Sequence, residues 1–238
     1  MNNIEYQDST RVLSKSFVAN VFMWMFAALG ITALTAYWFG TDQSLIMMMF
    51  SEHADGTVSM NILGWIVMLS PLAIVLIMSF AAEKMKASTM VILYMIYSVL
   101  MGMSLSFIFL VYAQASIFKT FIITAGMFGL MAVLGYTTKT DLTKFGSIML
   151  MGLFGIIIAS LVNMFMGSER LDYIISIIGV VIFTGLTAYD VQKIKNIGMA
   201  GIENNDTMTK ISIYAALSLY LDFINLFLYL LRFFGKQK

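Results

Sequence analysis

Long uncharged and mostly apolar runs dominate the chain, and short polar clusters separate them. Six such runs of 17 to 32 residues lie between successive charged residues, at 16–41, 56–82, 87–118, 120–138, 145–168 and 173–189. A helix needs about 20 apolar residues to cross a hydrocarbon core of about 30 Å. Each of the six runs therefore predicts one membrane span.

A seventh apolar segment follows Lys210, and it contains one acid. Residues 211–231 have the length of a span, but Asp222 lies near their middle. After polar clusters and glycines are trimmed from the runs, the pattern predicts helices at 17–39, 61–82, 89–112, 118–137, 145–166, 172–192 and 209–233. Pro71 lies inside the second helix, where a membrane span tolerates it as a kink. Residues 44–50 are too few to cross, and we expect a loop at the membrane interface there.

Composition agrees with a membrane protein and excludes several other classes. Of the 238 residues, 60% are hydrophobic and 11% are charged, whereas soluble domains have about 45–50% apolar and about 25% charged residues. The absence of Cys and the presence of a single His exclude disulfide frameworks, thiolate zinc sites and His-rich metal sites. A formal net charge of +1 offers no broad basic surface, so we expect no nucleic-acid partner.

These patterns predict one all-α polytopic membrane domain at 17–235, with tails at 1–16 and 236–238. Nine Lys and Arg residues lie in the N-terminal tail and the alternate loops on its side, against two in the other loops. The positive-inside rule then places the N-terminus in the cytoplasm. We expect the protein to lie in the inner (plasma) membrane. The basic C-terminal end lies outside if the seventh segment crosses, and inside if that segment dips in and returns. The charge count leaves both alternatives open.

Two of the 13 acidic residues stand out, because Asp222 interrupts the seventh segment and Asp190 closes the sixth. A carboxylate inside a membrane helix costs about 3 kcal/mol on insertion scales, so it usually faces a cavity or a partner. Asp222 belongs to a polar stripe whose spacings of three and four residues place its members on one helix face: Tyr214, Ser218, Asp222, Asn225 and Tyr229. The alternatives to a transport role are a structural polar contact for Asp222 and a solvated helix end for Asp190.

Intramembrane proteolysis is the enzymatic alternative, and the motifs argue against it. Aspartyl enzymes of this kind place Tyr-Asp in one helix and Gly-x-Gly-Asp in the next. Tyr189 and Asp190 match the first half, but Asp222 follows Leu-Tyr-Leu. A rhomboid-like serine protease would need a His within a span, and His53 is in a predicted outer loop. We therefore expect neither enzymatic activity nor a cofactor.

Four segments resemble the bacterial branch of the transmembrane Bax inhibitor motif family: GYTTKTDL (135–142), MGLFGIIIASLVNMF (151–165), GLTAYDVQKIK (185–195) and ALSLYLDFINLFLYLLRFFG (216–235). The resemblance extends from about residue 17 to 235. It implies six helices wrapped around a central seventh helix, with a cytoplasmic N-terminus. It also implies a pH-sensitive, calcium-permeable leak channel in which Asp190 and Asp222 form the proton sensor.

The resemblance further assigns a gate. A basic residue at the inner end of the second helix closes the pore by pairing with Asp190, and this residue is Lys84, with Lys86 as the competing alignment. Bacterial relatives can have Arg there, and Lys lacks the bidentate geometry of a guanidinium. Two carboxylates forced together in an apolar site cannot both ionise easily, so we expect Asp190 and Asp222 to share a proton.

The resemblance then implies that calcium is the permeant ion, and we expect Asp222 and Asp190 to bind it transiently along a pathway that Ser218 and Asn225 line. Calcium takes 6–8 oxygen ligands, and these side chains fall short of a tight cage, which favours passage over storage. The expected partners are the lipid bilayer, calcium ions and protons. The alternative function is a membrane-embedded regulator that binds another membrane protein, such as a quality-control protease.

Overall fold

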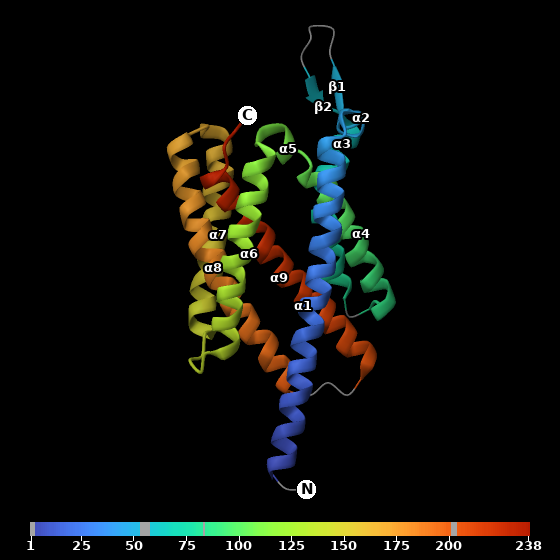
Figure 1. The fold of residues 1–238 in the computed structure, drawn as a ribbon, viewed down its shortest axis with the longest axis vertical. Helices are drawn as coiled ribbons and strands as arrows, with labels where there is room; N and C mark the ends of the chain where they lie inside the picture. Colours follow the sequence, from blue (N-terminus) through green and yellow to red (C-terminus); the bar gives the residue numbers. More distant parts are fainter. Residues whose placement is uncertain (1–2, 53–57, 83, 201–203) are drawn as a thin grey trace. The chain divides into compact units, whose positions relative to one another are not determined.

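The structure, a computed structural model, describes residues 3–52, 58–82, 84–200 and 204–238, with side chains from Ser14 onward except those of Glu52 and Val58. In chain order (Figure 1), its elements are α1 (Asn3–Thr41), α2 (Gln43–Met47), β1 (Phe50–Glu52), β2 (Val58–Met60), α3 (Ile62–Ala81), α4 (Ala87–Leu105), α5 (Ile108–Val111), α6 (Gln114–Thr137), α7 (Thr143–Met166), α8 (Glu169–Met199) and α9 (Asn205–Phe234). The chain divides into two compact units. Unit 1 comprises 1–20, 113–201 and 217–236, and unit 2 comprises 21–112, 202–216 and 237–238.

Seven helices in the described part of the chain are long and apolar enough to cross a membrane, namely α1, α3, α4 extended by α5, α6, α7, α8 and α9. This confirms the predicted all-α polytopic fold with seven spans. The last helix is the most enclosed, because 67% of its most hydrophobic 18 residues are buried, against 11–56% in the other six. Such enclosure agrees with a last helix that other helices surround.

The structure adds detail to three predicted segments. Helix α1 begins at Asn3, within the predicted tail at 1–16, and the part of it that could cross a membrane begins at Ser14, so the tail stays a prediction. The predicted span at 89–112 matches a candidate span at Ala87–Val111, in which α4 ends at Leu105 and α5 follows. The predicted loop at 44–50 begins as helix α2, because the Asp42 carboxylate caps it by accepting hydrogen bonds from the amides of Ser44 and Leu45. His53, for which we predict a loop, lies outside the described residues.

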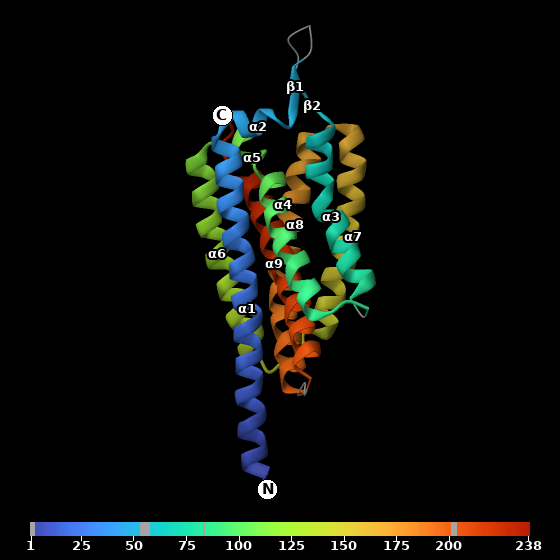
Figure 2. The same cartoon turned by 90° about the vertical axis from the view of Figure 1, so that its right-hand side faces the viewer.

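A two-stranded hairpin that the sequence pattern did not predict follows α2. Strands β1 and β2 pair antiparallel, with Phe50 opposite Met60. Asn61 joins this hairpin to α3, because its Oδ1 accepts from the Gly64 amide and its Nδ2 donates to the carbonyl of Met48 at 2.9 Å. In unit 2, shown from a second side in Figure 2, α3 packs against α4.

A hydrogen bond and a close backbone contact hold α1 to α4 in unit 2. Thr32 Oγ1 donates to the carbonyl of Ser98 at 2.8 Å, and both residues are buried. One turn later on α4, a Cβ at Gly102 would come within 2.7 Å of the Thr32 carbonyl oxygen. Small residues allow such backbone approach in membrane helices, where packing contributes more to association than hydrophobicity does.

Unit 1 packs α8 against both α6 and α7, and Figure 1 shows these three helices close together. The turn from α7 to α8 is encoded locally. Gly167 ends α7 in the left-handed conformation, with φ of 61°, and Ser168 begins α8 by accepting a hydrogen bond from the Leu171 amide.

Two glycines let α6 and α7 approach α8 just before Asp190. A Cβ at Gly135 of α6 would collide with the backbone of Ala188, and a Cβ at Gly146 of α7 would collide with the ring of Tyr189. These two contacts fix the part of α8 that carries Asp190.

The last helix is unbroken from Asn205 to Phe234 and is long and apolar enough to cross a membrane. Within unit 1, Arg232 near the end of α9 pairs with Asp172 in the first turn of α8, with 2.9 Å between Nη1 and Oδ1. Ser218 contacts Asp190, 18 residues further along α8. The two helices are therefore antiparallel over this whole length, and the alternative of a segment that dips in and returns is wrong.

Candidate functional site

Asp190 lies inside a helix and not at its end. The structure extends α8 to Met199, seven residues beyond the predicted end at 192. Asp190 is thus nine residues from the end of α8, and Ser218 is 13 residues from the start of α9 at Asn205. At 1.5 Å per residue these distances are about 14 Å and about 20 Å. The two helices bring Ser218 and Asp190, which are 28 positions apart in sequence, to the same level, where they form a hydrogen bond.

A serine connects the two helices at this level. Ser218 Oγ of α9 donates a hydrogen bond to Asp190 Oδ2 of α8. Asp222 follows Ser218 by one helical turn on the same face, and its carboxyl interacts electrostatically with that of Asp190. Three of the predicted site residues, Asp190, Ser218 and Asp222, therefore form one cluster in unit 1.

Asp222 is the most enclosed member of this cluster. Its side chain is 6% exposed, and its Oδ2 atom has no hydrogen-bond partner among the described residues. Its neighbour Phe223 packs edge-to-face on Phe121 and Phe128 of α6, with ring centroids 5.4 and 5.5 Å apart. A buried carboxyl oxygen without a partner costs free energy unless a proton, water or a cation satisfies it.

The surroundings of Asp190 are more polar. It is only partly buried, and Lys193, three residues along α8, is the basic side chain whose charge reaches it. Asp190 thus accepts a hydrogen bond from a hydroxyl and interacts electrostatically with a lysine, whereas Asp222 is buried and its Oδ2 has no partner among the described residues. The two acids of the cluster differ in their access to water and to charge.

For the other three members of the predicted stripe, the structure shows contacts with residues outside the cluster or an exposed side chain. Asn225 Nδ2 donates to the carbonyl of Leu221 in its own helix. Tyr229 stacks on Phe183 of α8, with centroids 5.8 Å apart. Tyr214 is 47% exposed and belongs to the part of α9 in unit 2. The pathway role of Asn225 stays a prediction.

Sequence reasoning missed the function of Gln192. The residues after Asp190 have the pattern of a helix leaving the membrane, but Gln192 is 8% exposed. Its Oε1 accepts from the Leu142 amide and its Nε2 donates to the Thr140 carbonyl, both at 2.8 Å. Gln192 therefore fixes the loop between α6 and α7 to α8. The sequence offered one indication of this contact, because the backbone groups of the polar segment GYTTKTDL (135–142) need hydrogen-bond partners.

Lys195 adds a second attachment to the end of α6. Its Nζ donates to the carbonyl of Tyr136 at 2.7 Å and lies 5.2 Å from the centroid of that tyrosine ring. The carbonyl of Lys195 accepts from Ser14 Oγ of α1 at 3.2 Å. These contacts explain why α8 continues to Met199.

The predicted latch residue is in the other unit. Lys84 is exposed in the turn after α3, and its amide donates to the carbonyl of Ala81. Lys86 is the N-cap residue of α4 and provides no side-chain cap. The pairing of either lysine with Asp190 stays a prediction.

A family described as "Inhibitor of apoptosis-promoting Bax1" matches residues 14–238, nearly the whole chain. The protein belongs to this family. It is 44% identical over 226 residues to "Inner membrane protein YbhL" of Escherichia coli K12, a match that covers 94% of this chain and 93% of that protein. It is 47% identical over 233 residues to a protein of Borreliella burgdorferi, covering 98% and 97% of the two chains. A membrane protein of Streptococcus pyogenes serotype M1 is 35% identical over the full length of both chains.

The two acids that the resemblance to this family identifies, Asp190 and Asp222, lie on helices α8 and α9. The described residues contain no group of three or more His, Cys, Asp or Glu side chains that could hold a metal ion. The cluster of Asp190, Ser218 and Asp222 offers two carboxyls and one hydroxyl. Such a set can exchange protons and give transient oxygen ligands to a cation that water still partly coordinates.

Proposed function

We propose that the protein is a pH-sensitive, calcium-permeable leak channel, with Asp190 and Asp222 as its proton sensor. The observation that supports this most strongly is the buried cluster on α8 and α9, in which Ser218 donates to Asp190 and an oxygen of Asp222 lacks a partner among the described residues. A carboxyl of this kind is costly to retain as a packing element. A role that uses the carboxyl chemically accounts for it.

In the protonated state, one proton serves the two carboxyls and the apolar packing around Asp222 is undisturbed. When that proton leaves, two negative charges face each other in an environment of low dielectric constant, where their repulsion is strong. Separation of the carboxyls relieves the repulsion and frees acceptor oxygens of Asp190 for Lys84. Ser218 can rotate its hydroxyl between donating and accepting roles as this happens.

Calcium is the permeant ion in this proposal. Asp222 and Asp190 contribute carboxylate ligands, and Ser218 and Asn225 contribute neutral oxygens. Four side chains cannot fill 6–8 coordination positions, so the ion keeps part of its water shell and leaves readily. Lys84 holds the closed state by pairing with Asp190 when that acid is ionised, which limits the leak at neutral pH.

We place the protein in the inner membrane with its N-terminus in the cytoplasm. The excess of Lys and Arg in the loops on that side supports this orientation. With α9 across the membrane, Arg232 and Lys238 then lie at the outer side against the charge rule. Arg232 is paired with Asp172, and Lys238 Nζ donates to the Phe109 carbonyl at 2.8 Å. Both positive charges have partners that reduce the cost of this position.

The decisive test is calcium flux into proteoliposomes of the purified protein between about pH 5 and pH 8. Wild-type flux should depend on pH. Asp190→Asn or Asp222→Asn leaves a single acid with a neutral amide, so flux should become nearly flat between about pH 6 and 8. Asp222→Asn should also lower maximal permeation, whereas Asp190→Asn should mainly alter gating.

Asp172→Asn is the matched control, because it removes a carboxylate from the same helix at the other end of α8 and should keep the pH profile. If both site variants titrate with the wild-type midpoint, the pair is not the sensor. If the wild type carries no calcium at any pH, the leak is excluded. The alternative of a regulator that binds another membrane protein would then be favoured.

A further inference from the structure

A groove lies where α6 ends and α7 begins. Its volume is about 370 Å³, and the residues that line it come from α6, the loop after it, α7 and α8: Met131, Leu134, Thr137, Thr138, Leu142, Phe145 and Ala188. All of them belong to unit 1. The groove therefore has the size of a small-molecule site, for which about 300–1,000 Å³ is usual.

The walls of this groove suit an apolar ligand. Met131 and Leu134 lie one turn apart on α6, and Thr137 and Thr138 follow at its end. The two hydroxyls already have backbone partners, because Thr137 Oγ1 donates to a carbonyl of its own helix at 2.7 Å and Thr138 Oγ1 accepts from the Thr140 amide at 3.2 Å. A ligand here would gain mainly apolar contact, as an acyl chain does.

Two lysines flank the loop end of the groove. Lys139 follows Thr138 in the loop, Lys144 lies in the first turn of α7, and both are exposed. Asp141 lies between them in sequence and opposes an anion, but its Oδ1 accepts hydrogen bonds from the amide and the hydroxyl of Thr143, at 2.9 and 2.6 Å. The loop end thus has one net positive charge.

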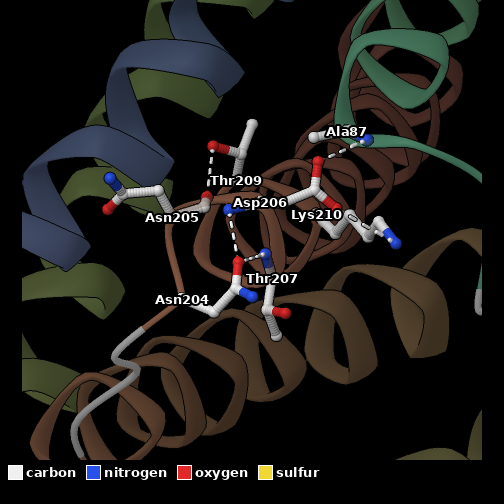
Figure 3. A network of polar contacts seen from close by, with 7 residues as sticks. All are labelled: Ala87, Asn204, Asn205, Asp206, Thr207, Thr209 and Lys210. Atoms are coloured by element: carbon white, nitrogen blue, oxygen red, sulfur yellow. Dashed lines mark hydrogen bonds and ion pairs between the residues drawn. The ribbon is translucent and has the colours of Figure 1, made fainter.

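These two lysines form no hydrogen bond or ion pair with another residue in the described part of the chain, although Lys144 affects Asp141 electrostatically. A lysine in unit 2 shows the contrast. Lys210 Nζ lies 3.3 Å from Asp206 Oδ2, and Oδ1 of the same carboxylate accepts from the Ala87 amide at 3.2 Å (Figure 3). The two lysines at the groove are therefore available to an external anion.

We propose that this groove binds an anionic phospholipid of the surrounding bilayer, with an acyl chain against Met131, Leu134 and Phe145 and the phosphate near Lys139 and Lys144. The charge count assigns this loop to the cytoplasmic side, where anionic headgroups attract basic residues. A zwitterionic lipid would cover the apolar walls equally well, so the positive charge decides which lipid is retained. This inference does not depend on the proposed leak.

A tryptophan in the groove measures lipid binding directly, because lipids with brominated chains quench tryptophan fluorescence on contact. The three natural tryptophans, Trp24, Trp38 and Trp65, are first replaced by Phe. Phe145→Trp then reports on the groove. Phe154→Trp is the matched control, because Phe154 lies on the same helix, is 66% exposed and does not line the groove.

The reporter should distinguish two lipids in mixed bilayers. At Phe145→Trp, the binding constant of brominated phosphatidylglycerol should exceed that of brominated phosphatidylcholine about fivefold, which corresponds to about 1 kcal/mol for one net interfacial charge. At Phe154→Trp, the two constants should be about equal. Lys139→Gln combined with Lys144→Gln should remove the preference at the groove. Asp141→Asn should increase it, because the opposing charge disappears.

A second measurement uses the wild-type chain and needs no tryptophan variant to fold. In native mass spectrometry after mild delipidation, the protein should retain phosphatidylglycerol in preference to phosphatidylcholine. Lys139→Gln combined with Lys144→Gln should lose this preference. Lys84→Gln combined with Lys86→Gln removes the same charge from unit 2 and should keep it.

Three results would overturn the proposal. Equal binding constants for the two lipids at Phe145→Trp would show that the groove holds only bulk lipid. If both double lysine variants lower the preference equally, the attraction is a general effect of charge. If glycerol 3-phosphate, which has the headgroup chemistry without acyl chains, displaces the lipid from the groove, the site binds a soluble anion and not a phospholipid.

Discussion

Replacement of Gly135 by Ala should destabilise the protein, although alanine is the better helix former. Gly135 lies in α6, and the added Cβ would meet the backbone carbonyl of Ala188 in α8. A backbone atom inside a helix cannot move aside as a flexible side chain can, so α6 or α8 must shift. Overpacking of this kind costs about 1–3 kcal/mol, and the gain in helix propensity offsets only about 0.5–1 kcal/mol.

The matched control is Gly129→Ala, six residues earlier on the same helix. The new Cβ there would have no neighbour within 4 Å, so only the gain in helix propensity remains. For a chain of this size, 1 kcal/mol shifts the melting temperature by about 2–4 °C. The net cost for Gly135→Ala is up to about 2.5 kcal/mol. Thermal unfolding in detergent should therefore show a decrease of up to about 10 °C for Gly135→Ala and an unchanged or slightly higher value for Gly129→Ala.

The same substitution should also disturb the site, because Ala188 is two residues before Asp190 on α8. Gly135→Ala should move the midpoint of the flux profile, whereas Gly129→Ala should leave it in place. A Gly135→Ala protein that melts at or above the wild-type temperature would show that the close contact between α6 and α8 does not exist. The position of Asp190 would then depend on other contacts.

Three other perturbations test separate contacts. Lys84→Ala should increase flux at neutral pH by freeing the latch, and an increase with Lys86→Ala instead would move the latch to that residue. Gln192→Leu should lower the free energy of unfolding by about 2–4 kcal/mol, since it leaves two backbone groups of the loop between α6 and α7 without partners. Hydrogen exchange in this loop should become faster. Unchanged exchange would contradict the attachment of the loop by Gln192. Two hydrogen bonds lower the pKa of Asp141, the larger effect coming from the Thr143 hydroxyl and the smaller from the Thr143 amide. The Thr143 amide should therefore stay protected from hydrogen exchange at neutral pH. This protection should disappear only as the pH falls through that lowered pKa. NMR titration measures this, and Asp141→Asn should abolish the transition.

The predicted site was partly accessible from sequence because a membrane makes polar residues conspicuous. Asp222 and Ser218 are one turn apart in an otherwise apolar segment, and this spacing alone places them on one helix face. Their contact with Asp190 was harder to predict, because the sequence pattern ends α8 near residue 192. The extension to Met199 depends on Gln192 and on Lys195, whose partners lie more than 50 residues away in sequence.

The sequence by itself determined the seven candidate spans, because the hydrocarbon thickness sets the length of apolar sequence that each span needs. That property is local and can be read from one segment at a time. The tertiary structure decided which groups meet: Ser218 with Asp190, Gln192 with the loop after α6, and Asp206 with the first amide of α4. A polar group near a helix end can be satisfied by water or by a distant segment, and only the packed structure distinguishes these outcomes.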